Sequence, residues 1–378
     1  MHRKVLNAAV PNPGLRPAGI RVAGDAATAR RKLLAWLEDM AMLHYVQHRV
    51  EEDRLAVSIL DTLAEDWMPF FDTTRLSRYL ESGTGSVEAI ERETVFAMLA
   101  APMLLEYPSV EEFAAAVRIR RNIVVAARKT QLTFDTSAAE RPTDYWTYSE
   151  DRGFTILPGK SLIAALEKAT QPGISGRPYA FSCYRATEYV ALLGIAQELE
   201  RTNPPLLKRL QTQWETRAIR SGEFHEAFLY ELGSMAEPLP AAYCVPGDRL
   251  WFRNPDARSS DIEGYEGSWV FYLGGGLFSN FWKSNRPFTI TTKSVEIFHW
   301  RHGIRSDGNG RLEMDETVVD ACVRKTLDNP VEVQRVLERM LRLRDPQGVY
   351  GAGGCIDATR EFPRRVCPGT ADIVLPCI

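Results

Sequence analysis

The spacing of hydrophobic residues predicts that the first third of the chain is helical. Between residues 28 and 63, apolar side chains recur three and four positions apart, which is the period of an amphipathic helix. The positions that set this pattern are Leu33, Leu34, Trp36, Leu37, Met40, Leu43 and Val46 for one helix, then Leu55, Ile59, Leu60 and Leu63 for a second. We therefore expect a flexible segment over residues 1–25 and a helical extension over residues 26–106.

The middle of the chain predicts a mixture of helices and short strands. Residues 144–148 and 153–156 have the aromatic and β-branched composition of strands around a turn. Turn-forming residues fill positions 172–178, and the apolar period of a helix follows them, from Cys183 to about Arg201.

The following part of the chain predicts a small antiparallel sheet. Residues 247–255 indicate one strand, and residues 268–282 indicate a hairpin that turns at three consecutive glycines. Residues 288–300 alternate enough to predict another strand. Beyond Gly303 the pattern predicts C-terminal helices over residues 303–345, and then an irregular tail over residues 346–378 that is rich in Gly, Pro, Cys and Arg.

Cys183 is the first residue with candidate chemistry, because the pattern places it where a helix begins. The unpaired backbone N–H groups and the dipole at a helix N-terminus favour a negative charge. A thiol in that position tends towards thiolate, which is the nucleophilic form. The competing interpretation is that Cys183 packs in the interior, as cysteines commonly do.

Composition and charge narrow the possible functions. The net charge of −3 provides no basic surface for nucleic acid, and no run of eighteen apolar residues predicts a membrane span. The N-terminus does not have the pattern of a signal peptide, so we expect a cytoplasmic protein, with export by an unrecognised route left open. The six cysteines and six histidines show no metal-ligand spacing, and His44 and His48, four apart on a predicted helix, lack the glutamate of a zinc-protease motif. We therefore expect no metal.

A helix-borne cysteine followed by a small antiparallel sheet is the element order of papain-like thiol enzymes. The strand residues 247–252 and 268–274 resemble the sheet of NlpC-type cell-wall peptidases. Residues from about 107 to about 290 resemble the bacterial spore transglutaminases, which are protein-glutamine gamma-glutamyltransferases. Five segments carry the resemblance: 121–127 (Arg-Asn-Ile-Val-Val-Ala-Ala), 144–146 (Asp-Tyr-Trp), 179–183 (Tyr-Ala-Phe-Ser-Cys), 247–255 (Gly-Asp-Arg-Leu-Trp-Phe-Arg-Asn-Pro) and 270–274 (Val-Phe-Tyr-Leu-Gly).

This resemblance implies an α+β fold with a papain-like, NlpC-like core over residues 107–302. It implies an acyltransferase that forms a thioester with a glutamine side chain of a protein substrate. The acyl group then passes to a lysine amine, or to water, without metal or nucleotide cofactor. The expected partners are proteins that offer glutamine and lysine side chains.

The resemblance also assigns roles to residues, with departures that matter. Cys183 falls on the family's nucleophile, whereas the family's acid or base positions are Ser182, Ser268 and Asn280 here. Glu266, two positions before Ser268 and on the same face of a strand, is the base that we predict instead.

Three aromatic residues correspond to aromatic positions of the family. They are predicted substrate contacts, with packing in the interior as the alternative for the two tryptophans: Tyr265, Trp146 and Trp251. His299 is a further candidate base, on a later predicted strand.

Two interpretations from different classes therefore stand. One is an active thiol acyltransferase, or an amidase or deamidase of similar fold, with Cys183 as nucleophile. The other is a catalytically inactive relative that binds a partner or serves as a structural component. The retained cysteine favours the first interpretation, and the neutral residues at the base positions favour the second. The tail could also cover the site as a lid.

Overall fold

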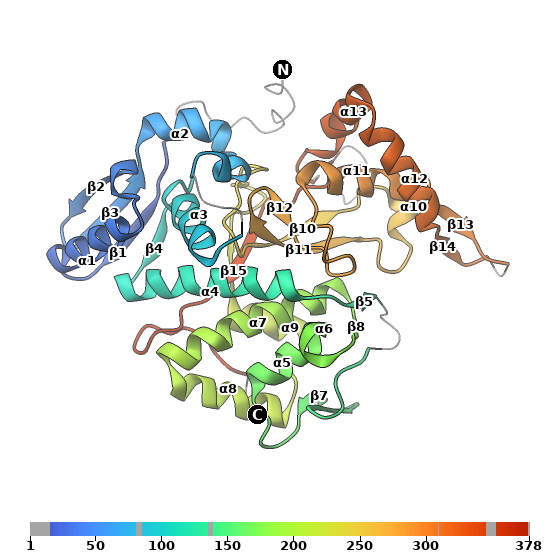
Figure 1. The fold of residues 1–378 in the computed structure, drawn as a ribbon, viewed down its shortest axis with the longest axis horizontal. Helices are drawn as coiled ribbons and strands as arrows, with labels where there is room; N and C mark the ends of the chain where they lie inside the picture. The colour runs from blue at the N-terminus through green and yellow to red at the C-terminus, as the bar shows by residue number, and fades with distance from the viewer. Residues whose placement is uncertain (1–15, 81–84, 135–138, 309, 345–352, 377–378) are drawn as a thin grey trace.

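The computed structural model describes residues 16–80, 85–134, 139–308, 310–344 and 353–376. In Figure 1, helix α4 (Val110–Lys129) runs across the molecule. A mixed α/β region of the N-terminal residues lies at its upper left, a helical layer lies below it, and a group of late helices lies at the upper right. This mixture of helices with small sheets confirms the α+β class at its coarse level.

The N-terminal region is a four-stranded sheet with helices, in the strand order β2-β3-β1-β4. Strand β1 pairs antiparallel with β3 and parallel with β4. The elements are β1 (Ile20–Ala23), α1 (Ala26–Asp39), β2 (Val46–Glu51), β3 (Arg54–Ile59), α2 (Asp61–Trp67), α3 (Val87–Leu99) and β4 (Leu105–Tyr107).

The prediction of a purely helical extension is therefore wrong over residues 46–59, which form a hairpin. Leu55 and Ile59 are four positions apart, a spacing that fits a helix and a strand equally well, and both are fully buried in β3. Residues 20–23 correct the prediction of a flexible start, because they form a central strand, whereas residues 1–15 lie outside the described part. His48 lies in β2 and His44 in a short 3-10 turn, so the two do not share a helix.

Helix α7 (Cys183–Thr202) packs along α4, and together they form the central layer. Gly194 of α7 permits the close approach, since a Cβ atom there would lie 2.6 Å from Ile123 Cγ1 of α4. The helices below and two short strand pairs complete this region: α5 (Leu162–Thr170), α6 (Pro172–Ser175), α8 (Pro204–Thr216), α9 (Ser221–Phe228), β5 (Thr133–Phe134) with β8 (Ala180–Phe181), and β6 (Trp146–Ser149) with β7 (Gly153–Ile156).

The five-stranded antiparallel sheet has the order β12-β11-β10-β15-β9. It confirms the predicted strand and glycine-turn hairpin. Its members, with one short helix after β10, are β9 (Leu229–Leu232), β10 (Arg249–Arg253), α10 (Ala257–Ser260), β11 (Gly267–Gly274), β12 (Leu277–Phe278) and β15 (Arg360–Pro363).

The C-terminal residues are not only an irregular covering, because β15 lies inside this sheet. Arg249 of β10 donates to Glu361 of β15, and His225 of α9 contacts the same carboxylate, with Nδ1 3.1 Å from Oε1. Residues 360–363 are thus built into the interior of the sheet. Cys355 and Cys367 are free, and Cys377 lies outside the described residues.

Residues 290–300 form a helix, α11 (Ile290–Trp300), where the alternation predicted a strand. Thr289 caps this helix by accepting a hydrogen bond from the backbone N–H of Thr292 at 3.1 Å. Packing against two later helices overrides the β-branched composition of the segment. Helices α12 (Glu316–Leu327) and α13 (Pro330–Met340) confirm the predicted late helices. The start of the range predicted as helical instead holds an antiparallel strand pair, β13 (Ile304–Ser306) with β14 (Leu312–Met314).

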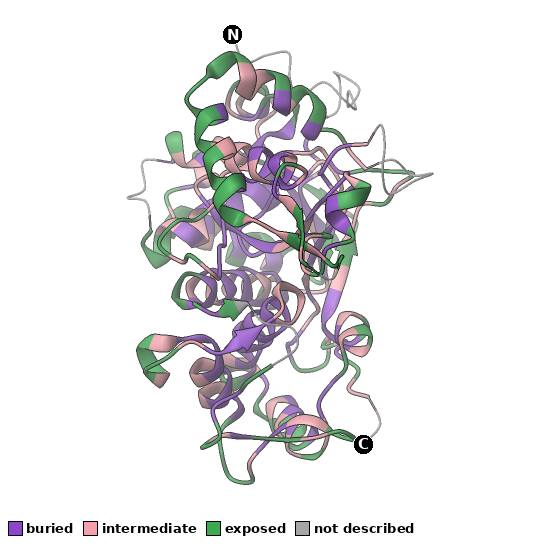
Figure 2. Cartoon of the chain, turned by 90° about the vertical axis from the view of Figure 1, so that its right-hand side faces the viewer, coloured by how far each residue is buried: buried purple, intermediate pink, exposed green. Residues whose placement is uncertain are grey.

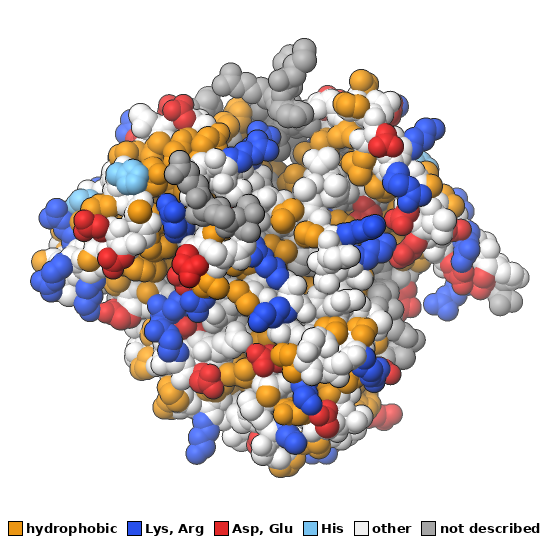
Figure 3. Space-filling model, in the orientation of Figure 1, with side chains coloured by type: hydrophobic (Ala, Val, Ile, Leu, Met, Phe, Trp, Pro, Cys, Tyr) orange, Lys and Arg blue, Asp and Glu red, His pale blue; other side chains and the backbone are white. Residues whose placement is uncertain are grey.

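Figure 2 shows buried positions concentrated in the central helices and strands, and exposed positions on the outer ones. On the face drawn in Figure 3, acidic and basic side chains are interspersed. No helix in the described part of the chain is long and apolar enough to cross a membrane.

Candidate active site

Cys183 is the first residue of α7, as the sequence predicts. The Oγ atom of Ser182 caps the helix by accepting a hydrogen bond from the backbone N–H of Arg185 at 3.3 Å. Strand β8 leads directly into this cap, and α7 packs against β11. The thiol is therefore fixed at the point where a helix N-terminus meets the antiparallel sheet.

The surroundings of the thiol act on its pKa in opposite directions. Burial raises the pKa of Cys183 above its ordinary value. A hydrogen bond from the backbone of Trp269 in β11 and the positive charge of Lys293 act in the other direction. Strand β12 pairs with β11 at Tyr272 and Gly274, and the backbone N–H of Ser279 just after it donates to the carbonyl of Phe271 at 2.9 Å.

Cys183 opens into a pocket of 520 Å³ between the sheet and the helices α11 and α12. The pocket wall combines aromatic side chains with charges of both signs. The lining includes Tyr265, Ser268, Asn280, Trp282, Lys283, Arg286, Phe288, Lys293, Glu296, Trp300, Glu316, Asp320 and Arg324. Three predicted site residues, Tyr265, Ser268 and Asn280, thus lie in one pocket with Cys183.

Lys293 is the most unusual charged group in this wall, because only 3% of its surface is exposed. Its Nζ atom lies 4.0 Å from the ring centre of Phe288 and 3.2 Å from Glu296 Oε2. A buried cation is stable in a protein when it is paired in this way. Its charge favours a thiolate at Cys183.

The structure does not bring Glu266 into this pocket. Its side chain is exposed, and Oε1 accepts a hydrogen bond from the backbone N–H of Gly264 at 3.3 Å. Glu266 follows Tyr265 in the loop before β11, and the carboxylate turns back along that loop. Its assignment as the base stays a prediction, and this arrangement does not support it.

Asn280 and Tyr265 have partners that define their positions. The Asn280 side chain donates to the carbonyl of Arg286 at 3.0 Å and accepts from the backbone N–H of Lys283 at 3.1 Å, so it holds the loop after β12. The Tyr265 hydroxyl donates to Glu316 Oε1 at 3.0 Å, which ties the sheet side of the pocket to α12.

The two tryptophans that were predicted as substrate contacts lie elsewhere. Trp146 is buried in the helical layer, where its Nε1 donates to the carbonyl of Ala165 at 3.0 Å. Trp251 stacks on Trp269, with ring centres 5.6 Å apart, and lies outside the pocket lining. Their observed contacts are those of packed side chains.

Several groups in the pocket were missed by the sequence analysis, namely Lys293, Glu296 and Glu316. They lie on α11 and α12. The alternating pattern of the first segment predicts a strand, and the second segment lies beyond the predicted core of residues 107–302. His299, the other candidate base, does not line the pocket. Burial lowers the pKa of His299 to about 4, with a further contribution from His302.

Comparison with known protein families shows to which family the chain belongs. The family model for protein-glutamine gamma-glutamyltransferase matches residues 72–367, which is well over half of the chain. The chain belongs to this family. The transglutaminase match is wider than the resemblance seen in the sequence, since it begins before α3 and ends after β15.

Other comparisons add little to this result. A transglutaminase from Geobacillus stearothermophilus, solved without its C-terminal extension, shares 18% identity with the chain and has a TM-score of 0.39. That alignment covers 57% of this chain and 98% of the other. No curated protein matches the chain significantly.

Proposed function

We propose that the protein is a thiol acyltransferase that uses Cys183 to form a thioester with a glutamine side chain of a protein. The observation that carries this proposal is the position of Cys183, at a helix N-terminus and open to a pocket within the transglutaminase match. A buried cation acts on the same thiol. Such surroundings are where reactive cysteines occur.

In the first step, the sulfur of Cys183 attacks the carboxamide carbon of glutamine. Negative charge then develops on the former carbonyl oxygen, and the backbone N–H groups at the start of α7 are suited to stabilise it. The C–N bond breaks, and the proton that leaves the thiol ends on the nitrogen, so that ammonia departs and a thioester remains.

In the second step, a lysine amine attacks the thioester carbon and the C–S bond breaks. The amine gives up a proton, the thiol regains one, and an isopeptide bond joins the two proteins. Water in place of the amine would give deamidation. The pocket carboxylate that contacts Lys293 is Glu296, so we propose Glu296 as the proton acceptor in both steps.

An inactive, partner-binding role is the second candidate, and two observations favour it. The family's acid and base positions hold the neutral residues Ser182, Ser268 and Asn280. Burial also raises the pKa of Cys183, which disfavours the thiolate before substrate binds. A papain-like amidase or deamidase would share the first step and differ only in the acceptor.

The test measures incorporation of a labelled primary amine into a glutamine-bearing protein, together with ammonia release. Wild type should show both activities. Cys183→Ala should abolish both, and Glu296→Gln should lower both by about a hundredfold, a typical effect of losing a general base. Glu266→Gln should retain activity if its carboxylate stays outside the pocket.

Glu263→Gln is the matched control for Glu266→Gln, since Glu263 is an exposed carboxylate in the same loop, and it should retain activity. Ammonia release without amine incorporation would assign a deamidase. Full activity in Cys183→Ala would overturn the proposal. Inactivity of folded wild type on several protein substrates would favour the binding role.

A further inference from the structure

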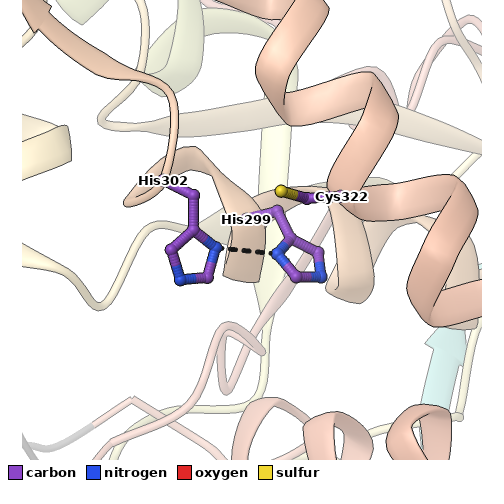
Figure 4. A group of neighbouring side chains, drawn as sticks. All are labelled: His299, His302 and Cys322. Carbon is purple, nitrogen blue, oxygen red and sulfur yellow. Dashed lines mark hydrogen bonds between the residues drawn. The ribbon is translucent and has the colours of Figure 1, made fainter.

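Three potential metal ligands meet where the end of α11 packs against α12. His299 lies in the last turn of α11, His302 follows that helix, and Cys322 lies in α12. Figure 4 shows the two imidazole rings facing one another with the sulfur of Cys322 beside His299. One ligand atom from each residue lies within 4.8 Å of the others. Cys322 therefore shares one site with two histidines that lie 20 or more positions before it in the sequence.

The hydrogen bonds of His299 leave one ring nitrogen directed at this site. Its Nε2 lies 2.8 Å from the hydroxyl of Thr326, and its Nδ1 lies 2.9 Å from Nδ1 of His302. Histidines that bind metals usually make such a hydrogen bond with the other ring nitrogen, which fixes the tautomer and the ring orientation. Thr326 thus holds His299 in the orientation that a metal ligand needs.

We propose that His299, His302 and Cys322 bind a zinc ion through two Nδ1 atoms and one thiolate. Zinc–nitrogen bonds of about 2.0 Å and a zinc–sulfur bond of about 2.3 Å place tetrahedral ligand atoms roughly 3.3 to 3.6 Å apart. The ligand atoms already lie within 4.8 Å of one another and the two Nδ1 atoms lie 2.9 Å apart, so side-chain rotations would have to adjust these separations to reach that geometry. The thiol proton of Cys322 is released to solvent on binding.

The ligand set argues for zinc over magnesium or calcium. Imidazole and thiolate are the ligands of zinc and related transition metals, whereas magnesium and calcium prefer oxygen. His299 is buried, Cys322 is half-buried and His302 is exposed, so a fourth position faces solvent and can hold water.

The zinc site would join the two helices that form one wall of the Cys183 pocket. Trp300 lies next to His299, and Val323 lies next to Cys322, and both line that pocket. A metal bond between α11 and α12 would fix the spacing of these wall residues. The site lies outside the pocket lining and is independent of the acyl-transfer proposal.

The test treats the full chain with a chelator, adds zinc chloride alone, and measures bound zinc after gel filtration. We expect one equivalent in wild type and in Cys183→Ala. His302→Ala and Cys322→Ser should each lose at least tenfold in zinc affinity. His48→Ala is the matched control because His48 is also exposed, and it should bind zinc as wild type does.

Two further readouts report on the ligand atoms themselves. Zinc should slow the alkylation of Cys322 at least tenfold and leave the alkylation of Cys183 unchanged, as measured by peptide mass spectrometry. With cobalt in place of zinc, the thiolate-to-metal absorption band should be present in wild type and absent in Cys322→Ser. Failure to retain zinc, equal binding by His302→Ala, or alkylation of Cys322 that zinc does not slow would overturn the proposal.

Discussion

At the scale of the residue, the reactivity of Cys183 depends on a balance between burial and charge. Burial raises the pKa of the thiol, and the Trp269 backbone hydrogen bond and Lys293 oppose that effect. Lys293 is itself buried, so solvent screens its charge less than it would at the surface. The lysine is therefore the side chain most able to change thiolate formation without touching the sulfur.

Replacing Lys293 with methionine should slow alkylation of Cys183 severalfold at neutral pH. Methionine keeps the approximate shape of the side chain but removes its charge, so the pKa of Cys183 should rise and the pH–rate profile should move to higher pH. The measurement is the alkylation rate of Cys183 against pH, followed by peptide mass spectrometry.

Lys208→Met is the control for this change, because Lys208 is exposed on α8 far along the chain from the pocket. Lys293→Arg retains the charge and should recover a large part of the rate. An unchanged profile in Lys293→Met, with the fold intact by circular dichroism, would refute the assigned role of Lys293.

The residue scale also shows where sequence reasoning succeeds. Cys183 was found because turn-forming residues precede a helical period, a local signal. The direction of Glu266 was not predictable, since it depends on the hydrogen bond to Gly264 in an irregular loop. Lys293 and Glu296 were missed because the contact between them requires residues 290–300 to be a helix, and their place in the pocket arises only after α11 has packed.

At the scale of the element, the placement of Cys183 relies on close packing between α4 and α7. Gly194 lies where these helices approach, and its missing Cβ leaves room for Ile123 and for the backbone of Ile119. A shift of α7 would carry Cys183 with it, because the cysteine is its first residue. Packing at the middle of the helix thus positions the chemistry at its end.

Gly194→Ala should destabilise the protein by about 1 to 3 kcal/mol, the usual cost of overpacking a core. The added methyl group would lie 2.6 Å from Ile123 Cγ1 and 3.0 Å from the backbone N of Ile123. The free energy of unfolding in urea measures this cost.

Gly222→Ala is the matched substitution, because Gly222 lies in helix α9 and nothing comes within 4 Å of its added Cβ. It should leave stability unchanged or raise it slightly through helix propensity. Equal stability of the Gly194 and Gly222 variants would show that the α4–α7 contact is not tight.

The type of an element was predictable where the hydrophobic spacing fitted only a helix or only a strand. The prediction failed where the spacing fitted both. The spacing of Leu55 and Ile59 suits either a helix or a strand, and only pairing with β1 and β2 decides for a strand. For α11, a β-branched composition predicted a strand, whereas the Thr289 cap and the contacts with α12 and α13 give a helix.

At the scale of the whole molecule, the C-terminal residues complete the core. Strand β15 lies between β10 and β9, and Glu361 pairs with Arg249, which also donates to Thr187 of α7 at 2.8 Å. Farther along, Glu112 of α4 accepts hydrogen bonds from the backbone N–H groups of Val366 and Cys367. The described residues 353–376 do not line the Cys183 pocket.

A chain that ends at Asp345 should therefore lose its cooperative fold. It should not gain activity, as it would if the tail were a lid over the site. The truncation removes β15 from the interior of a sheet and leaves Arg249 and Glu112 buried without these partners, each at a cost of a few kcal/mol. Thermal unfolding followed by circular dichroism measures the effect, and a chain that ends at Pro376 is the control. A folded, more active truncated protein would instead support a lid.

Contacts between segments far apart in the chain are the part of the fold that the sequence did not predict. The helix, strand and hairpin around the cysteine follow from local periods and from family resemblance. The insertion of β15 between two earlier strands depends on pairing over more than a hundred residues, which no local period reveals. The composition of residues 346–378 therefore predicts an irregular tail, although residues 360–363 pair inside the sheet.

The central claim is that Cys183 performs acyl transfer in its pocket. The most direct measurement compares labelled-amine incorporation by wild type and by Cys183→Ala on the same glutamine-bearing protein. The account predicts incorporation by wild type and none above background by the variant, with equal stability of the two proteins. Incorporation at equal rates by both would contradict the account.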